Sequence, residues 1–387
     1  MELRKIFDAD TAMVRKLWAS SFEKEGEPFY EWFFAERYRP EQAVGAFDGQ
    51  ELLAALHMMP YSIYLRGAFH ATRYIMGVAV FPRYRGQGIF GQLMAASLQE
   101  MNQAGIALSV LQPVVPSLYV RYGWDICYHY YKYNLPADWL KTVEAPGDYR
   151  IVDADRTAFA DLEQIYEANV QGRHGFLRRR PADWEVLLSE TRQETGQVQL
   201  LCLGGQARAY AVHVAYGGRR IVKELAYTDA AAGQALLQYL FSLGSASGRI
   251  ELHLPPDDAA FLRFCDYQDA ITLQPFIAAR IVNIASVLEN SVYPPGVACS
   301  LRFKCIDSLA PWNNGCFELA VTRGRGTLRP VQDNQVELTI GALSLLVFGR
   351  LSASNLVRSG QLQADKAVVG LLDSLWPPKE NYITEMF

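Results

Sequence analysis

Apolar positions in the first third of the chain alternate between helix-like and strand-like spacing. Between residues 10 and 22, apolar side chains recur every three to four positions, which predicts an amphipathic helix. The Asp48-Gly49 pair separates two apolar runs and predicts a β-hairpin. The whole predicted order is helix, helix, three or four strands, helix, strand, helix, strand. The later segments in that order are 30–34 (helix), 61–65 and 74–81 (strands), 88–104 (helix), 106–111 (strand), 118–123 (helix) and 127–135 (strand).

The middle of the chain repeats a similar order of elements after a predicted linker at 135–150. Two helical segments precede three strands, and the last strand leads directly into another helix, as in the first third. These segments are 157–170, 183–190, 198–204, 207–216, 220–227 and 228–243. The repeated order predicts a degenerate second copy of the first domain.

From about residue 284 onward, alternating strands are followed by helices, which is typical of a small α+β domain. The predicted fold class is therefore mixed α/β (α+β), in three domains at 1–145, 146–284 and 285–387.

Composition narrows the class of protein. The chain has 387 residues, half of them hydrophobic, and a formal net charge of −4. That charge argues against a nucleic-acid partner. No apolar run is long enough to span a membrane, and the N-terminus lacks the apolar segment of a signal peptide. The six cysteines form no Cys-Xaa-Xaa-Cys pair, and we expect reduced thiols in a cytoplasmic protein without a metal.

The stretch "VAVFPRYRGQGIFGQLM" places two arginines and two glycines between a predicted strand and a predicted helix. A helix N-terminus offers free N–H groups, glycines let an anion approach the backbone, and arginines bind phosphate. The turn therefore predicts a pyrophosphate-binding site. A Walker loop fits worse because Ile89 follows Gly88. A dinucleotide fold also fits worse, although Gly86, Gly88 and Gly91 match its spacing, because several strands and helices come first.

The spacing Arg-Xaa-Xaa-Gly-Xaa-Gly, followed by "SLYVRYGW", resembles the GNAT acetyltransferases. With "LEQIYE", "GFLRRRPADWEVLL", a C-terminal part similar to sterol carrier protein 2 and the last residue Phe387, the whole chain resembles the Eis (enhanced intracellular survival) family. The resemblance implies tandem GNAT folds, the second degenerate, plus a C-terminal domain like sterol carrier protein 2, and a homohexamer.

The resemblance also implies residue roles. Acetyl-CoA is expected along the strand and the turn, at Val78, Ala79, Val80, Arg83, Arg85, Gly86, Gln87, Gly88 and Ile89. Tyr119 is expected to protonate the departing sulfur, and the α-carboxylate of Phe387 to handle the amine. A phenol titrates near ~10 and a thiol near ~8.5, so this proton transfer has a modest cost.

Residues that bind the acceptor are less defined by the sequence. Glu23, Glu25, Trp32 and Glu385 are candidates for binding a cationic amine, with a solvated loop and a core aromatic as the alternatives. The six histidines are isolated; His57, on a strand near the expected site, is the most interesting of them. The arginine run at 178–180 is expected on a solvated or interface surface.

The sequence thus predicts an acetyl-CoA-dependent N-acetyltransferase that acts on a primary amine by direct attack on the thioester. The amine could belong to an aminoglycoside, a polyamine or a lysine. Two alternatives stay open: a longer-chain N-acyltransferase, and a non-catalytic lipid-binding or ligand-binding protein that uses the carrier-like domain.

Overall fold

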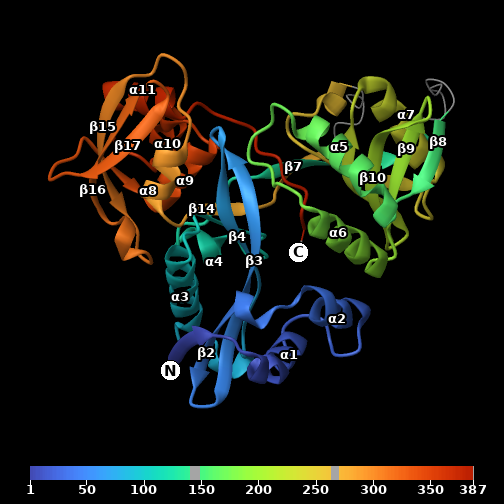
Figure 1. Cartoon of the computed structure of the whole chain (residues 1–387), viewed down its shortest axis with the longest axis horizontal. Coiled ribbons are helices and arrows are strands. Elements are labelled where there is room, and N and C mark those ends of the chain that lie inside the picture. The colour runs from blue at the N-terminus through green and yellow to red at the C-terminus, as the bar shows by residue number, and fades with distance from the viewer. Residues whose placement is uncertain (140–148, 263–269, 387) are drawn as a thin grey trace.

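Three β-sheets organise the chain in the computed structural model, which describes residues 1–139, 149–262 and 270–386 (Figure 1). The first sheet has the strand order β1 (Glu2–Lys5), β2 (Ala43–Asp48), β3 (Glu51–Leu65), β4 (Ala68–Val80), β5 (Leu108–Leu111), β14 (Ala278–Ile281) and β6 (Asp125–Ile126). The second has the order β13 (Ile271–Pro275), β7 (His129–Pro136), β12 (Arg249–Leu254), β11 (Arg219–Tyr227), β10 (Gln206–Tyr216), β9 (Gln197–Leu203) and β8 (Tyr149–Asp153). The third has the order β17 (Arg325–Pro330), β16 (Gly315–Thr322), β15 (Cys299–Ile306) and β18 (Val336–Thr339).

Helices accompany each sheet. The first domain contains α1 (Thr11–Ala19), α2 (Pro28–Trp32), α3 (Ile89–Gln103) and α4 (Ser117–Val120). The second contains α5 (Phe159–Val170), α6 (Pro181–Gln193) and α7 (Ala230–Ser242). The third contains α8 (Ile284–Asn290), α9 (Ile340–Phe348), α10 (Ala353–Arg358) and α11 (Lys366–Leu375). Within the described ranges, no helix combines the length and the apolarity needed to cross a bilayer.

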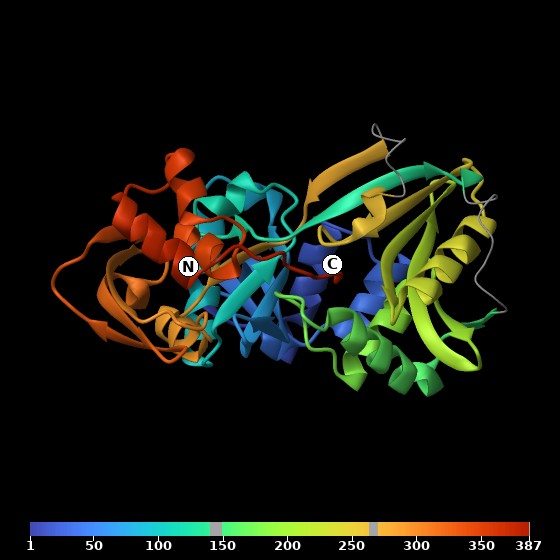
Figure 2. The ribbon, with the colours of Figure 1, turned by 90° about the horizontal axis from the view of Figure 1, so that it is seen from above.

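The first two sheets exchange strands. β7 comes from the first predicted domain but pairs with β12 and β13 of the second sheet, whereas β14 returns to the first sheet between β5 and β6. The two connections run side by side, because Cys127 and Tyr128 donate to the carbonyl of Ile277. Figure 2 shows this ribbon bridging the two sheets. A boundary at 145/146 therefore divides the sequence but does not divide the sheets.

Most predicted elements of the first domain appear in the structure. The Asp48-Gly49 hairpin joins β2 to β3, with Gly49 at φ +56°. The runs at 61–65 and 74–81 belong to the two long strands β3 and β4, which pair over most of their length. Residues 149–150 of the predicted linker begin β8, and residues 140–148 lie outside the described part. The sequence pattern missed β1, because its ELRK segment is a largely exposed edge strand.

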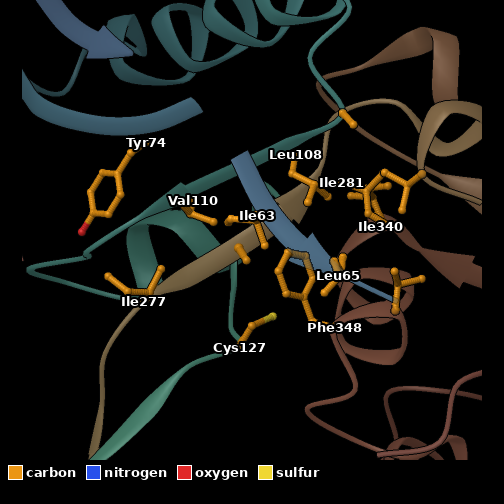
Figure 3. Packing of buried hydrophobic residues seen from close by; sticks show 14 of the residues in the cluster. Ile63, Leu65, Tyr74, Leu108, Val110, Cys127, Ile277, Ile281, Ile340 and Phe348 are labelled. Carbon is orange, nitrogen blue, oxygen red and sulfur yellow. The ribbon is translucent and has the colours of Figure 1, made fainter. Parts of the chain in front are cut away.

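One apolar core joins the first sheet to the third domain. Figure 3 shows Ile63, Leu65 and Val110 of the sheet packing near Ile340 and Phe348 of α9. Every residue of α9 is buried. The third domain is thus packed firmly against the first sheet, so it can influence the shape of a site there.

Candidate active site

The end of β4 offers an unpaired strand edge. β5 pairs with β4 only from Thr72 to Ile75, so none of the described strands pairs with that side of β4 from Met76 to Val80. On the other side, Ala55 and Ala79 are partners and so are His57 and Met76, which leaves Gly77 and Val78 opposite the single residue Leu56. This is a β-bulge, and bulges turn backbone N–H groups out of the ladder. The predicted residues Val78, Ala79 and Val80 therefore lie along an edge that can accept an extended ligand.

Gly77 is required at this bulge for a steric reason. Its φ is +58°, and a Cβ there would lie 2.5 Å from Trp18 Cζ3 and 3.0 Å from His57 Nδ1. His57 itself is 1% exposed and packed against the rings of Trp18, Phe33 and Tyr38. Burial lowers the pKa of His57 to about 4, so its ring is neutral at physiological pH.

The predicted anion-binding turn leads into α3. Gly86 and Gly88 have φ values of +79° and +77°, and Gly88 is the N-cap residue of a fifteen-residue helix that has no side-chain cap. A Cβ on either glycine would meet open space, so their left-handed backbone conformation explains the choice of glycine. The first N–H groups of α3 are thus available to an anion. The expected residues Gly86, Gln87, Gly88 and Ile89 form this turn.

The two arginines of the turn differ in their partners. Arg83 forms an ion pair with Glu51, which also accepts a hydrogen bond of 2.8 Å from the Tyr84 hydroxyl. Arg85 is exposed, and its Nε donates to the Val80 carbonyl at 3.1 Å. Arg85 is therefore the arginine whose charge is more readily available to a phosphate.

Tyr119 lies on α4, beside the end of β4 and the start of α3. Its ring meets that of Phe90 in an edge-to-face contact, with centroids 5.4 Å apart. Val78, Val80 and Tyr119 all pack against the same apolar cluster. Burial raises the pKa of Tyr119, which keeps the phenol protonated at neutral pH.

Two contacts hold Tyr122, in the turn that follows α4. A Cβ on Gly91 would lie 2.6 Å from the Tyr122 hydroxyl oxygen, so this glycine lets Tyr122 pack closely on α3. Arg280 of β14 donates to the Tyr122 carbonyl and forms an ion pair with Asp307 of the third domain. Neither side chain of that ion pair is exposed. The third domain thereby supports the segment that carries Tyr119, a role that the sequence pattern did not reveal.

The C-terminal segment runs from the third domain between the first two sheets (Figure 1). Asn381 fixes its course, because its amide nitrogen donates to the carbonyls of Cys127 and Phe348, both at 3.0 Å. Its amide oxygen lies 2.7 Å from Nδ1 of His174. Asn381 therefore connects the segment to all three domains.

Further along, Arg179 holds the segment through a buried network. It makes two hydrogen bonds of 2.8 Å to Glu224, one of 2.9 Å to Thr384 and one of 2.9 Å to Glu385. The expectation of a solvated or interface run at 178–180 is wrong for Arg179, which is 7% exposed, because acidic partners distant in sequence neutralise it.

The last described residues face a cavity between the first and second domains. Its wall includes Tyr61, Asp183, Glu190, Glu194, Lys223, Glu224, Glu385 and Met386. Burial raises the pKa of Glu190 to about 7. Among the described residues Glu190 has no ion-pair partner, whereas Glu385 pairs with Arg179. Glu190 was missed at the sequence level, because one acidic residue on a helix gives no distinctive pattern. Phe387 lies outside the described residues, and its role stays a prediction.

The other predicted acceptor residues are not brought together. The Glu23 carboxylate accepts a hydrogen bond of 2.9 Å from the Trp18 indole, while Glu25 is exposed. Trp32 is buried and donates to the Ser189 hydroxyl at 3.0 Å. Trp32 thus packs α2 against α6, as the core alternative implies.

Three known domain families match successive parts of the chain. Residues 2–127 match an acetyltransferase (GNAT) domain family, and residues 175–281 match a second acetyltransferase (GNAT) domain family. Residues 284–384 match a sterol carrier protein domain family. A protein of Streptomyces avermitilis described as an uncharacterized N-acetyltransferase is 24% identical over 348 residues, which cover 84% of this chain and 83% of that protein.

Solved structures share the fold over the full length. A GCN5-related N-acetyltransferase from Anabaena variabilis has a TM-score of 0.86 at 20% identity, with all of both chains covered. Eis1 from Mycobacterium abscessus has a TM-score of 0.78 at 16% identity, also with all of both chains covered. The predicted order of domains is confirmed: this chain combines two GNAT acetyltransferase domains with a C-terminal domain of the sterol carrier protein type.

Proposed function

We propose that this protein transfers the acetyl group of acetyl-CoA to a primary amine of a polycationic acceptor. The observation that carries the proposal is the open edge of β4 from Met76 to Val80, which leads through the glycine turn into the uncapped N-terminus of α3. The GNAT domain match over residues 2–127 supports the same reaction class.

The geometry suits the coenzyme in three places. The pantetheine arm would hydrogen-bond to the edge of β4, as an added strand does. The pyrophosphate would bind the N–H groups of residues 86–89, with Arg85 beside them. The bulge at Gly77 and Val78 would direct an N–H group at the thioester oxygen. When bound, acetyl-CoA supplies the activated acetyl group.

In the proposed reaction the neutral amine nitrogen attacks the thioester carbon and the carbon–sulfur bond breaks. Tyr119 donates its phenolic proton to the sulfur, and the proton lost by the amine returns to the phenolate through solvent. No acetyl-enzyme is needed. Released thiol and amide form in equal amounts.

The acceptor would enter from the cavity that holds Glu190 and Glu385. Tyr61, in the cavity wall, is four residues from His57 along β3, and His57 adjoins the bulge. At about 3.3 Å per residue, the cavity is roughly 13 Å from the bulge. An acceptor with a second ammonium group at that distance could place one amine at the thioester and the other at Glu190. This favours polyamines and aminoglycosides over a simple monoamine.

The experiment is thiol release from acetyl-CoA with spermine, an aminoglycoside, a lysine peptide and propylamine as acceptors. We expect turnover with a polyamine or an aminoglycoside and at least tenfold lower kcat/KM with propylamine. Replacing Tyr119 by phenylalanine should lower kcat about 10²-fold or more. The matched control is Tyr216→Phe, at a position that is 71% exposed on the second domain.

Each part of the proposal can fail separately. No thiol release with any acceptor would refute the reaction. Full turnover in Tyr119→Phe would remove Tyr119 from the role of acid. Faster release from decanoyl-CoA than from acetyl-CoA would favour the longer-chain alternative.

Finer assignments also belong to this proposal. The three-domain order, shared in fold with Eis1 of Mycobacterium abscessus, supports an Eis-like protein. The expected hexamer follows from that assignment, whereas the expected cytoplasmic location rests on the scattered cysteines of the sequence. Analytical ultracentrifugation of the purified chain tests the hexamer directly.

A further inference from the structure

A second cavity, of about 770 Å³, lies where the three domains meet, and Arg179 lines both this cavity and the acceptor cavity. The turn between β3 and β4 forms one wall, α5 and residues 171–179 form another, and the third domain closes it with residues 292–295 and Lys379. Neither the open edge of β4 nor Tyr119 contributes to this cavity. Nothing in the proposed acetyl transfer uses it.

Part of its wall is aromatic. The rings of Tyr64, Phe69 and Phe176 contact one another, with centroid separations of 5.0–6.0 Å. Phe69 remains 38% exposed although it belongs to this cluster, and Val292 on the opposite wall is 45% exposed. Exposed apolar side chains that converge on a concave surface are typical of a ligand site.

Arg66 supplies a cation at the same cavity. It is 6% exposed, and its Nε and Nη2 donate to the carbonyls of Val347 and Leu346 at 2.7 and 3.0 Å. These carbonyls belong to the last turn of α9, whose dipole offsets about half a charge. No carboxylate of the described residues forms an ion pair with Arg66. A buried cation without a carboxylate partner leaves room for an anion from outside.

The other charges around Arg66 make its surroundings positive. Lys379 also lines the cavity and forms no ion pair within the described ranges, whereas Arg173 pairs with Asp257 at 2.9 Å. The His174 ring accepts a hydrogen bond from the Arg66 backbone N–H, and burial together with the Arg66 and Lys379 charges lowers its pKa to about 3. The ring is thus neutral and does not repel an anion or attract one.

The acidic residues of the cavity wall lie on a different element from Arg66 and Lys379. Glu163 and Glu167 lie on the α5 wall. An anionic group would therefore be directed away from α5 and toward the cations Arg66, Lys379 and Arg178. Arg178 also contacts the apolar cluster, with its guanidinium carbon 3.8 Å from the centroid of the Phe69 ring.

We propose that this cavity binds an organic carboxylate with an apolar body, with the carboxylate at Arg66 and Lys379 and the body on the Tyr64–Phe69–Phe176 cluster. The volume would accommodate either an aromatic acid or a medium-chain fatty acid. The site includes neither the open edge of β4 nor Tyr119, and its test does not require acetyl transfer.

The test is isothermal titration of the full chain with decanoate, phenylbutyrate and the uncharged analogue decanol. We expect both acids to bind and decanol to bind at least tenfold more weakly. A hydrogen bond to a charged group predicts that Arg66→Met weakens both acids roughly 10- to 100-fold. Arg358→Met is the matched control, because Arg358 is exposed on the third domain, and it should leave the affinities unchanged. Tighter binding of phenylbutyrate would identify an aromatic acid as the ligand class, and tighter binding of decanoate a fatty acid.

Because Arg66 also bonds α9, two milder variants accompany it. Lys379→Met removes only a surface charge, and Phe69→Ser removes a half-exposed ring, so circular dichroism should show both folded. Each should weaken both acids several-fold. The proposal is overturned if neither acid binds at millimolar concentration, if decanol binds as tightly as decanoate, or if Lys379→Met and Phe69→Ser both retain the wild-type affinity.

Discussion

Replacing Asp307 by alanine should destabilise the contact between the first and third domains more than any surface substitution. The carboxylate of Asp307 forms an ion pair with Arg280 and accepts hydrogen bonds from Asn313 Nδ2 at 2.9 Å and from the backbone N–H groups of Leu309 and Ala310 at 3.1 Å. Alanine would leave a fully buried guanidinium without its counter-charge.

The expected loss follows from that burial. Removing one partner of a buried ion pair costs about 3–5 kcal/mol, because the remaining charge stays desolvated. This corresponds to roughly a 10²- to 10⁴-fold change in the unfolding equilibrium. The Arg302–Asp333 pair is the matched control, since its side chains are 41% and 63% exposed. Asp333→Ala should therefore cost less than about 1 kcal/mol.

Urea unfolding followed by tryptophan fluorescence measures both losses, and Trp124, whose ring centroid is 4.8 Å from the Arg280 guanidinium carbon, is a local reporter. A double variant, Arg280→Met with Asp307→Leu, removes both charges and should recover most of the lost stability. The reasoning is refuted if Asp307→Ala and Asp333→Ala differ by less than about 1 kcal/mol, or if the double variant is as unstable as Asp307→Ala.

Three further predictions follow from the sites described above. Gly77→Ala should lower both the stability, by about 1–3 kcal/mol, and kcat, whereas Gly49→Ala, also at positive φ but with open space around its Cβ, should leave kcat unchanged; equal kcat values would contradict the role of the bulge. Burial raises the pKa of Glu190 to about 7, so this carboxyl becomes negatively charged as the pH rises through 7. The KM for a polyamine, divided by the KM of Glu190→Gln at the same pH, should therefore fall roughly fivefold over that range. A ratio that does not change with pH would exclude Glu190 from amine binding. Because burial lowers the pKa of His57 to about 4, the unfolded chain takes up a proton on this residue at higher pH than the folded chain does. The free energy of unfolding should therefore fall by about 3 kcal/mol as the pH falls from about 6.5 to 4. In urea unfolding, the free energy of His57→Phe should depend less on pH, and the same dependence as in the wild type would refute this assignment.

The glycine turn shows which features of this site can be predicted from the local sequence pattern. A strand that ends at Phe81, glycines at 86 and 88 and an apolar helix pattern afterwards suffice to predict the turn and the helix that follows. These features depend on backbone conformation and on neighbours in the sequence. The structure places each of them where the pattern predicts, with α3 starting at Ile89.

The ion pairs of the structure could not be predicted from the sequence pattern. Arg179 and its neighbours in the run 178–180 have the same residue type, yet only Arg179 meets Glu224 and Glu385, which are 45 and 206 residues away in the sequence. Likewise, the partner of Arg280 is Asp307 because β14 enters the first sheet. Which charged residue is buried depends on how distant parts of the chain fold together. Neither the composition nor a short motif specifies that arrangement.

The sequence by itself thus determined most elements of the first domain and the glycine turn before α3, because these depend on short-range hydrophobic periodicity and on the conformational freedom of glycine. The choice of Tyr119 came instead from the resemblance to the GNAT acetyltransferases, and its role stays a prediction. Only the tertiary structure decided the strand exchange between the sheets, the support of α4 by the third domain and the two cavities. Those features arise where segments that are distant in the sequence come into contact, and the free energy of such contacts depends on burial, which a linear pattern does not specify.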